Sequence, residues 1–436
     1  AVADQEAHGG DLVGAGGSGL GREVVALQGN TFINGGGGDD LLIVDRLPTM
    51  NSYQGLVVAS FAKDAQGRQL RDELTIDGQD GSDHTIINIE GATSDYVINV
   101  VDTGSSLDAL DVLTIEGTSA DDTFLMRSGM VANLREDGTG GYLDAFERIN
   151  YTSAVNGRVI VEGLDGDDSF YFDDNSAIMT VDGGAGDDFF QVGQLFATSR
   201  DVATDGVFAI ESVADRFETI PVSFGFLSLG ISLPAVLYGG SGEDRFVVYS
   251  NHADLRLEGE DDNDEFVIRA FALGDGTKVK LNGGGGDDLI QYNVNAPVDI
   301  DGGAGFDKIV VLGTEFADVF VITKDGVYGA GLTVRMSNAE AMEVDGLEGD
   351  DTFYVLSTAA DVVTTIIGGL GSDTFNIAGD VTKTVVADND GSQGAISHTV
   401  QSGDLRYNGM FVRGLDLTAT GATTGASLDT GDGLSV

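Results

Sequence analysis

One short loop motif recurs twelve times along the chain, and this repetition limits the possible folds more than any other feature. The motif is an apolar residue, any residue, Gly, four loop residues, Asp, any residue and usually an apolar residue. The copies, numbered by their first Gly, are GGGGDDLL (35), GQDGSDHT (78), GTSADDTF (117), GLDGDDSF (163), GGAGDDFF (183), GGSGEDRF (239), GEDDNDEF (259), GGGGDDLI (283), GGAGFDKI (302), GTEFADVF (313), GLEGDDTF (346) and GGLGSDTF (368). Alternating apolar and polar residues bracket the loops, which is typical of half-buried strands. The predicted repeating unit is strand, glycine-rich turn, strand.

Aspartate occupies the same place in every loop: Asp40, Asp83, Asp122, Asp168, Asp188, Asp244, Asp264, Asp288, Asp307, Asp318, Asp351 and Asp373. Six loops carry a second Asp directly before it: Asp39, Asp121, Asp167, Asp187, Asp287 and Asp350. Two positions after the shared Asp stands Phe in eight copies, and Leu42, Ile290 and Ile309 fill three more. Each unit thus offers a carboxylate at its turn and a large apolar side chain on its second strand.

The spacing of the loops favours a solenoid. The first glycines at 163 and 183, at 239, 259, 283 and 302, and at 346 and 368 follow one another at roughly 20 residues. Those at 35, 78, 117 and 163 lie about twice as far apart. A coil of about 20 residues, with some coils lacking the loop, accounts for both sets. The intervals 183–239, 302–313 and 313–346 fit neither value and predict insertions or deletions.

The fold class predicted is all-β, a parallel β-solenoid of the β-helix or β-roll kind. One strand pair is too short to bury its own Phe, so neighbouring units must stack and share a core. A β-propeller is the alternative, because its blades repeat about every 40 to 50 residues; the tight spacings argue against it. The loop order GT, GL, GG at 117, 163 and 183 returns at 313, 346 and 368, which indicates that a block was duplicated.

The organisation expected along the chain has five parts. Residues 1–31 form a flexible glycine-rich arm, 32–192 a first solenoid block, and 193–236 a loop-poor insertion or unmarked coils. Residues 237–378 form a second block and 379–436 a C-terminal β and tail region. Helix should be minor, with residues 338–343 able to form one turn.

The loop chemistry suits a hard cation. Glycines permit backbone conformations in which successive carbonyl oxygens turn toward one point, and Asp adds carboxylate oxygens. Calcium takes six to eight oxygen ligands and tolerates irregular geometry better than magnesium does. We therefore expect several calcium ions, with the twelve loop aspartates as ligands and Asp39, Asp167, Asp187, Asp287 and Asp350 as additional ones.

GGAGDDFF, GGGGDDLI, GGSGEDRF and GGLGSDTF resemble the hemolysin-type calcium-binding repeat of RTX proteins, G-G-x-G-x-D followed by any residue and a large apolar one. Interleaved GT and GL loops are similar to those of large bacterial calcium-binding surface proteins. The resemblance implies that Asp40, Asp188, Asp244, Asp288, Asp307 and Asp373 are ligands. Loops 117, 313 and 259 lack the second and fourth glycines, so Asp122, Asp318 and Asp264 are expected to cap turns. Because the loops recur once per coil, and not in the tandem nonapeptide arrangement of that family, ions should line one edge.

Composition restricts the function. A net charge of −50 disfavours binding to nucleic acid or to anionic membranes, and no apolar run is long enough to insert into a bilayer. Calcium-dependent folding fits an extracellular location, where the ion is abundant. The expected function is a structural one: surface layer, matrix, adhesin stalk or filament subunit that self-associates into a polymer or layer, with surface glycans as a further partner class. No catalytic motif is found; the alternative is a calcium-dependent polysaccharide lyase or epimerase using the basic residues Arg256, Arg269, Lys278 and Lys280.

Overall fold

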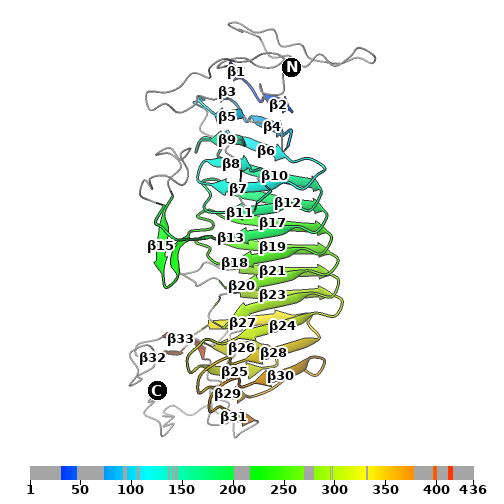
Figure 1. The fold of residues 1–436 in the computed structure, drawn as a ribbon, viewed down its shortest axis with the longest axis vertical. Coiled ribbons are helices and arrows are strands. Elements are labelled where there is room, and N and C mark those ends of the chain that lie inside the picture. The colour runs from blue at the N-terminus through cyan, green and yellow to red at the C-terminus, as the bar shows by residue number, and fades with distance from the viewer. Residues whose placement is uncertain are drawn as a thin grey trace, which may run out of the picture.

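The structure, a computed structural model, describes residues 31–46, 73–91, 96–105, 109–135, 138–139, 142, 146–200, 217–269, 279–294, 296, 298–329, 332–377, 396–399 and 411–415. This part of the chain is all-β and contains no helix. Its strands form two long sheets, and in each sheet the strands are mostly parallel and follow one another along the long axis of the molecule (Figure 1). The arrangement is consistent with a β-solenoid-like fold, and the sheets are continuous instead of being divided into the four-stranded blades of a propeller.

The first sheet, here called sheet A, has fourteen strands. In spatial order they are β1 (Thr31–Gly37), β3 (Glu73–Asp80), β5 (Tyr96–Val101), β9 (Glu147–Tyr151), β8 (Met130–Asn133), β7 (Thr123–Arg127), β11 (Ser169–Phe172), β13 (Phe189–Val192), β18 (Arg245–Val248), β20 (Glu265–Ile268), β22 (Leu289–Asn293), β24 (Lys308–Leu312), β28 (Ala341–Asp345) and β30 (Val363–Ile367). All pairs are parallel except the two that involve β8.

The second sheet, sheet B, also has fourteen strands. Their order is β2 (Leu41–Asp45), β4 (His84–Asn88), β6 (Val112–Glu116), β10 (Arg158–Asp165), β12 (Met179–Ala185), β17 (Ala235–Ser241), β19 (Leu255–Asp261), β21 (Val279–Gly285), β23 (Val298–Ala304), β27 (Leu332–Ser337), β26 (Gly326–Gly329), β25 (Val319–Thr323), β29 (Thr352–Val355) and β31 (Thr374–Ile377). Only the pairs of β26 are antiparallel. We call one passage of the chain through both sheets a rung.

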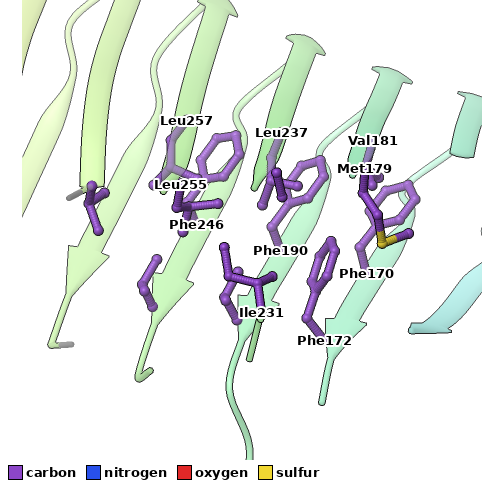
Figure 2. Close-up of a cluster of buried hydrophobic side chains, with 14 of the residues drawn as sticks. Phe170, Phe172, Met179, Val181, Phe190, Ile231, Leu237, Phe246, Leu255 and Leu257 are labelled. Carbon is purple, nitrogen blue, oxygen red and sulfur yellow. The ribbon is translucent and has the colours of Figure 1, made fainter. Parts of the chain in front are cut away.

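The core lies between the two sheets and is built from repeated side chains. Phe170, Phe190 and Phe246 of sheet A face Val181, Leu237 and Leu257 of sheet B, and all six are fully buried (Figure 2). Phe124, Phe170, Phe190, Phe246 and Phe266 stack in one row, with ring centroids 4.6–5.4 Å apart. Phe320, Phe353 and Phe375 form a second row at 4.9 Å spacing in sheet B.

The interval 78–117 includes a turn without the loop motif, between β5 and β6, as the spacing had suggested, but the other two long intervals do not contain a coil without a loop. β1 pairs directly with β3, and β6 pairs directly with β10, so the intervals 35–78 and 117–163 each belong to a single rung. Extra chain is accommodated between the strands of that rung, by the β7–β8–β9 meander in the second case. The intervals 313–346 and 183–239 contain insertions, as predicted, because β25 pairs with β29 and β12 with β17.

The segment 193–236 carries a small separate sheet. Its antiparallel strands are β14 (Leu195–Phe196), β16 (Gly225–Ser228) and β15 (Thr219–Val222), and they project from the side of the stack (Figure 1). Of the predicted C-terminal region only β32 (Ile396–Thr399) and β33 (Phe411–Leu415) are described, and residues 1–30 of the predicted arm lie outside the described residues.

The helical turn expected at 338–343 is wrong. Asn338 has a left-handed backbone (φ 49°) that turns the chain from β27 into β28, which begins at Ala341. Among the described residues no helix is long and apolar enough to cross a membrane.

Candidate metal site: the aspartate ladders

The twelve loops lie on both edges of the stack, which corrects the expectation of a single edge. At the first edge the chain passes from sheet A to sheet B, and at the second from sheet B to sheet A. The loops at 35, 78, 313, 346 and 368 are on the first edge, and those at 117, 163, 183, 239, 259, 283 and 302 are on the second. The motif changes edge between loops 78 and 117 and returns between loops 302 and 313.

Eleven of the twelve loop aspartates are tied to the following rung by their backbone N–H. In most cases the N–H donates to Oδ1 of the aspartate in that rung. On the second edge this ladder runs through Asp122, Asp168, Asp188, Asp244, Asp264, Asp288 and Asp307 and ends at Glu340, with N···O distances of 2.7–2.9 Å. On the first edge it runs from Asp40 to Asp83, and from Asp318 through Asp351 to Asp373, at 2.7–3.0 Å.

The other carboxylate oxygen is left without a partner in nine of the twelve loops. Oδ2 is buried and receives no hydrogen bond in Asp40, Asp83, Asp168, Asp188, Asp244, Asp264, Asp288, Asp307 and Asp351. It points at the first glycine of its own loop, next to a carbonyl oxygen of the following rung. At Gly35, for example, a Cβ atom would lie 2.9 Å from Asp40 Oδ2 and 2.7 Å from Gly78 O. Two oxygen acceptors therefore converge at eight of these nine loops; at Gly78 only Asp83 lies close.

Two exceptions are the loops with Thr at the second position. Asp122 Oδ2 accepts hydrogen bonds from the backbone N–H and the hydroxyl of Thr118, at 2.7 and 2.9 Å. Thr314 caps Asp318 in the same way. These two carboxylates therefore cap turns, as their sequences suggested. The third exception, Asp373, belongs to the last rung.

Asp264 does not cap a turn, which corrects the prediction for the glycine-poor loop at 259. Its Oδ2 is buried without a partner, like those of the glycine-rich loops. Glu260 and Asp262 adopt positive φ values of 81° and 76°, the backbone form that glycine supplies elsewhere. The loop therefore keeps the geometry of its neighbours despite its sequence.

The acidic residues that precede the loop aspartate in seven of the twelve loops take part in a second, exposed ladder of opposite polarity. The backbone N–H of Asp187 donates to Oδ1 of Asp167 in the preceding rung, at 3.0 Å, and Asp167 donates likewise to Asp121. Asp39, Asp287 and Asp350 accept in the same way from later rungs. The second carboxylate thus has a structural role that requires no metal.

Burial raises the pKa of the inner aspartates, and neighbouring carboxylates raise it further against the effect of the backbone N–H bond. The pKa is raised to about 8 for Asp168, Asp244 and Asp264, to about 7 for Asp188 and to about 6 for Asp288. An ionised ladder therefore needs a compensating positive charge.

Three ladder members escaped the sequence template. Asp111 accepts the N–H of Asp83 at 2.9 Å, Asn156 accepts that of Asp111 at 3.0 Å, and Glu340 accepts that of Asp307. None follows a glycine loop. Asp111 does match the second half of the motif, since Val112-Leu113-Thr114-Ile115 follows it, and this signal could have identified it.

The donor set shown at each loop is small, and a calcium ion held there would need further oxygen ligands to reach the six to eight that it takes. Within the described ranges no three His, Cys, Asp or Glu side chains gather around one point. Nine loops offer one unpartnered carboxylate oxygen, and in eight of them a backbone carbonyl oxygen also lies at the first glycine. Calcium accepts such mixed oxygen ligands, so the residues that would hold it are the nine aspartates with an unpartnered Oδ2.

The predicted basic cluster is only partly assembled. Arg256 and Lys280 are register partners on β19 and β21, and the Arg256 guanidinium is paired with Glu258. Lys278 lies outside the described residues.

A scan against protein-family models finds no match to this chain, and a search of curated proteins finds no significant match. The likeness to the hemolysin-type repeat therefore rests on the loop residues themselves.

Proposed function

We propose that this chain is a calcium-stabilised extracellular structural protein, a parallel β-solenoid with loops of the hemolysin type. The observation that carries the proposal is the repeated, buried Asp Oδ2 that has no hydrogen-bond donor and lies beside a backbone carbonyl oxygen. An isolated unsatisfied carboxylate oxygen is costly, and its recurrence in rung after rung implies a shared ligand.

Protons or cations can neutralise the ladder near neutral pH, since the pKa of Asp168, Asp244 and Asp264 is raised to about 8, and a cation would act by displacing those protons. Adjacent rungs are about 5 Å apart, and ionised carboxylates at that spacing repel one another. The whole chain carries a net charge of −50. Divalent ions between the rungs would neutralise this charge and join each rung to the next, so that binding free energy becomes folding free energy.

The location and role follow from this dependence. Extracellular calcium is abundant enough to drive folding and cytosolic calcium is scarce, which favours an outside location. A long stack of rungs is suited to a mechanical role as a surface layer, matrix component, adhesin stalk or filament subunit, and surface glycans are a further class of partner.

The test is circular dichroism with light scattering on the full chain in calcium, in chelator and in magnesium. We expect the β signal to be lost or its thermal midpoint to fall strongly in chelator, and magnesium to restore it poorly. A β signal and a hydrodynamic size that ignore chelation would reject calcium as the stabilising ion.

A further inference from the structure

The two ends of the stack are built alike. The first rung consists of β1 in sheet A, the glycine-rich loop at 35 and β2 in sheet B. The last consists of β30 in sheet A, the glycine-rich loop at 368 and β31 in sheet B. Although the motif moves to the second edge for most of the molecule, both terminal loops lie on the first edge. Each terminal strand has a single neighbour within the described part of its sheet.

We infer that these ends bind one another, so that the last rung of one copy stacks on the first rung of a second copy, head to tail. This inference rests on the proposed structural function and deepens it by naming the partner and the surfaces. Aligning the two loops places Ile366 opposite Ile33, Thr374 opposite Leu41 and Phe375 opposite Leu42. Both sheets would continue in parallel register from one molecule to the next.

The hydrogen-bonding groups at the two ends are complementary. In every step of the buried ladder the earlier residue donates its N–H to a side-chain oxygen of the later one, which is Oδ1 wherever the later residue is Asp. Among the described residues no acceptor receives the N–H of Asp373, and no donor reaches Oδ1 of Asp40. Stacking would join them as Asp40 is joined to Asp83. In the exposed ladder Ser82 precedes Asp83, and its hydroxyl accepts the N–H of Leu110 in the following rung at 3.0 Å. Ser372 holds the equivalent position before Asp373, so its hydroxyl could accept the N–H of Asp39 from the second copy.

The packing surface of the last rung is open, whereas Leu42 of the first rung, which would lie opposite Phe375, is only 8% exposed. Phe375 stacks on Phe353 with one face and is 45% exposed, so the second phenylalanine row ends open. Leu370 and Ile377 at the same end are 71% and 70% exposed. A Cβ on Gly369 or Gly371 would collide with a carbonyl of the preceding loop, whereas Gly36 and Gly38 have nothing within 4 Å. In the later loops a carbonyl of the preceding loop lies against these glycines, and in the first loop the corresponding space is empty.

Two different surfaces meet in this contact, so it is heterologous and does not close on itself. Repetition along the stack axis produces an open filament. The competing occupant of either end is a part of the same chain outside the described residues, and the experiment below distinguishes the two.

The experiment uses the absence of cysteine from the full chain. Leu41→Cys and Thr374→Cys are prepared as separate variants, mixed in calcium and oxidised. In the stacked register their Cα atoms lie about 5 Å apart, within disulfide range. The control mixes Leu41→Cys with Asn376→Cys, two positions out of register and about 8 Å away. All variants are first checked for an unchanged β signal.

We expect the matched pair to form at least about ten times more disulfide dimer than the mismatched pair, and either variant alone to form little. Equal yields, dominant dimers of Leu41→Cys alone, or a chain that stays monomeric at every concentration up to its solubility limit would overturn the inference. Failure of the calcium proposal is seen separately: a β signal that survives chelation rejects calcium, whatever the cross-linking yields.

Discussion

At the scale of single residues, one aspartate in each glycine-rich loop has two different oxygens. Oδ1 accepts an N–H from the neighbouring rung, while Oδ2 is buried beside a carbonyl oxygen. The hydrogen bond to Oδ1 fixes the position of the chain. The buried, unpartnered Oδ2 requires a nearby positive charge when the carboxylate is ionised. The Thr loops show the contrast, because Thr118 satisfies Oδ2 of Asp122 without any ion.

Replacing Asp188 by Asn should therefore have opposite effects with and without calcium. The amide oxygen can still accept the N–H of Asp168, and the amide nitrogen can donate toward Gly239 O. We expect a gain of about 1 kcal/mol in the free energy of unfolding in chelator and a smaller stabilisation by calcium, measured by urea titration in both conditions.

Asp122→Asn is the matched control. Both oxygens of Asp122 accept from donors, including Asn133 and Thr118, so one amide donor would face another donor. A loss of about 1–3 kcal/mol is expected with or without calcium. Identical responses of the two variants would contradict the division of roles.

Glycine at the first loop position is required by contact and not by backbone angle. A Cβ at Gly183 would overlap Asp188 Oδ2 and lie 2.6 Å from Gly239 O. Gly183→Ala should lower the free energy of unfolding by about 1–3 kcal/mol. Gly37→Ala, where nothing lies within 4 Å, should change it by less than about 0.5 kcal/mol. Thermal or urea unfolding decides, and equal costs would refute the crowding described at Gly183.

The raised pKa values predict how stability depends on pH when calcium is absent. The folded-state pKa of Asp168, Asp244 and Asp264 is about 8, well above the unfolded value near 3.8. Between these values the native state binds more protons than the unfolded state, so the free energy of unfolding falls as pH rises from about 4 to about 8. Calcium displaces those protons, and its stabilising increment should grow over the same range.

Urea titrations at pH 5 and pH 8 in calcium-free buffer check this prediction. A variant carrying Asn at all three positions should show a flatter dependence on pH. Stability that increases with pH in the calcium-free wild type would count against a buried, protonated ladder.

At the scale of elements, the strands followed directly from the alternation of residues, and the phenylalanine two places after the Asp in eight of the loops marked the core face. What the alternation could not supply was the edge on which a loop lies. The motif reads identically whether the chain passes from sheet A to sheet B or back. The edge changes where the chain makes more or less than one full rung between two loops: three strands, β4, β5 and β6, lie between loops 78 and 117, and only β24 lies between loops 302 and 313.

The site was predictable to a similar extent. All twelve loop aspartates lie at turns between the sheets, but local sequence did not show that Glu260 and Asp262 could take the backbone form of glycine. It also missed Asp111, which joins the ladder without a glycine loop of its own. Ladder membership is a property of neighbouring rungs, and a pattern read along one segment does not contain it.

The phenylalanine rows predict a large cost for losing one ring. Phe190 is fully buried and stacks on Phe170 and Phe246 at 4.8 and 4.6 Å. Phe190→Ala should lower the free energy of unfolding in calcium by about 3–5 kcal/mol. Phe306→Ala, at a loop side chain that is 54% exposed, should cost less than about 0.5 kcal/mol. Equal losses in the two variants would contradict the assignment of the phenylalanine row to the core.

At the scale of the whole molecule, the rungs form a column with two carboxylate-lined edges, an apolar interior and matching ends. Stability in such a stack is a sum of terms between neighbouring rungs. Ions that join rungs on both edges would stiffen the column as well as hold it folded, and equivalent ends would allow the same contacts to continue between molecules.

The most direct test of the central claim is an anomalous difference map from crystals grown in calcium. The account predicts peaks beside the unpartnered Oδ2 atoms of glycine-rich loops on both edges, such as those of Asp83 and Asp188, and none beside Asp122 or Asp318. A map without peaks at these loops, or with peaks only at the exposed outer acids, would contradict it.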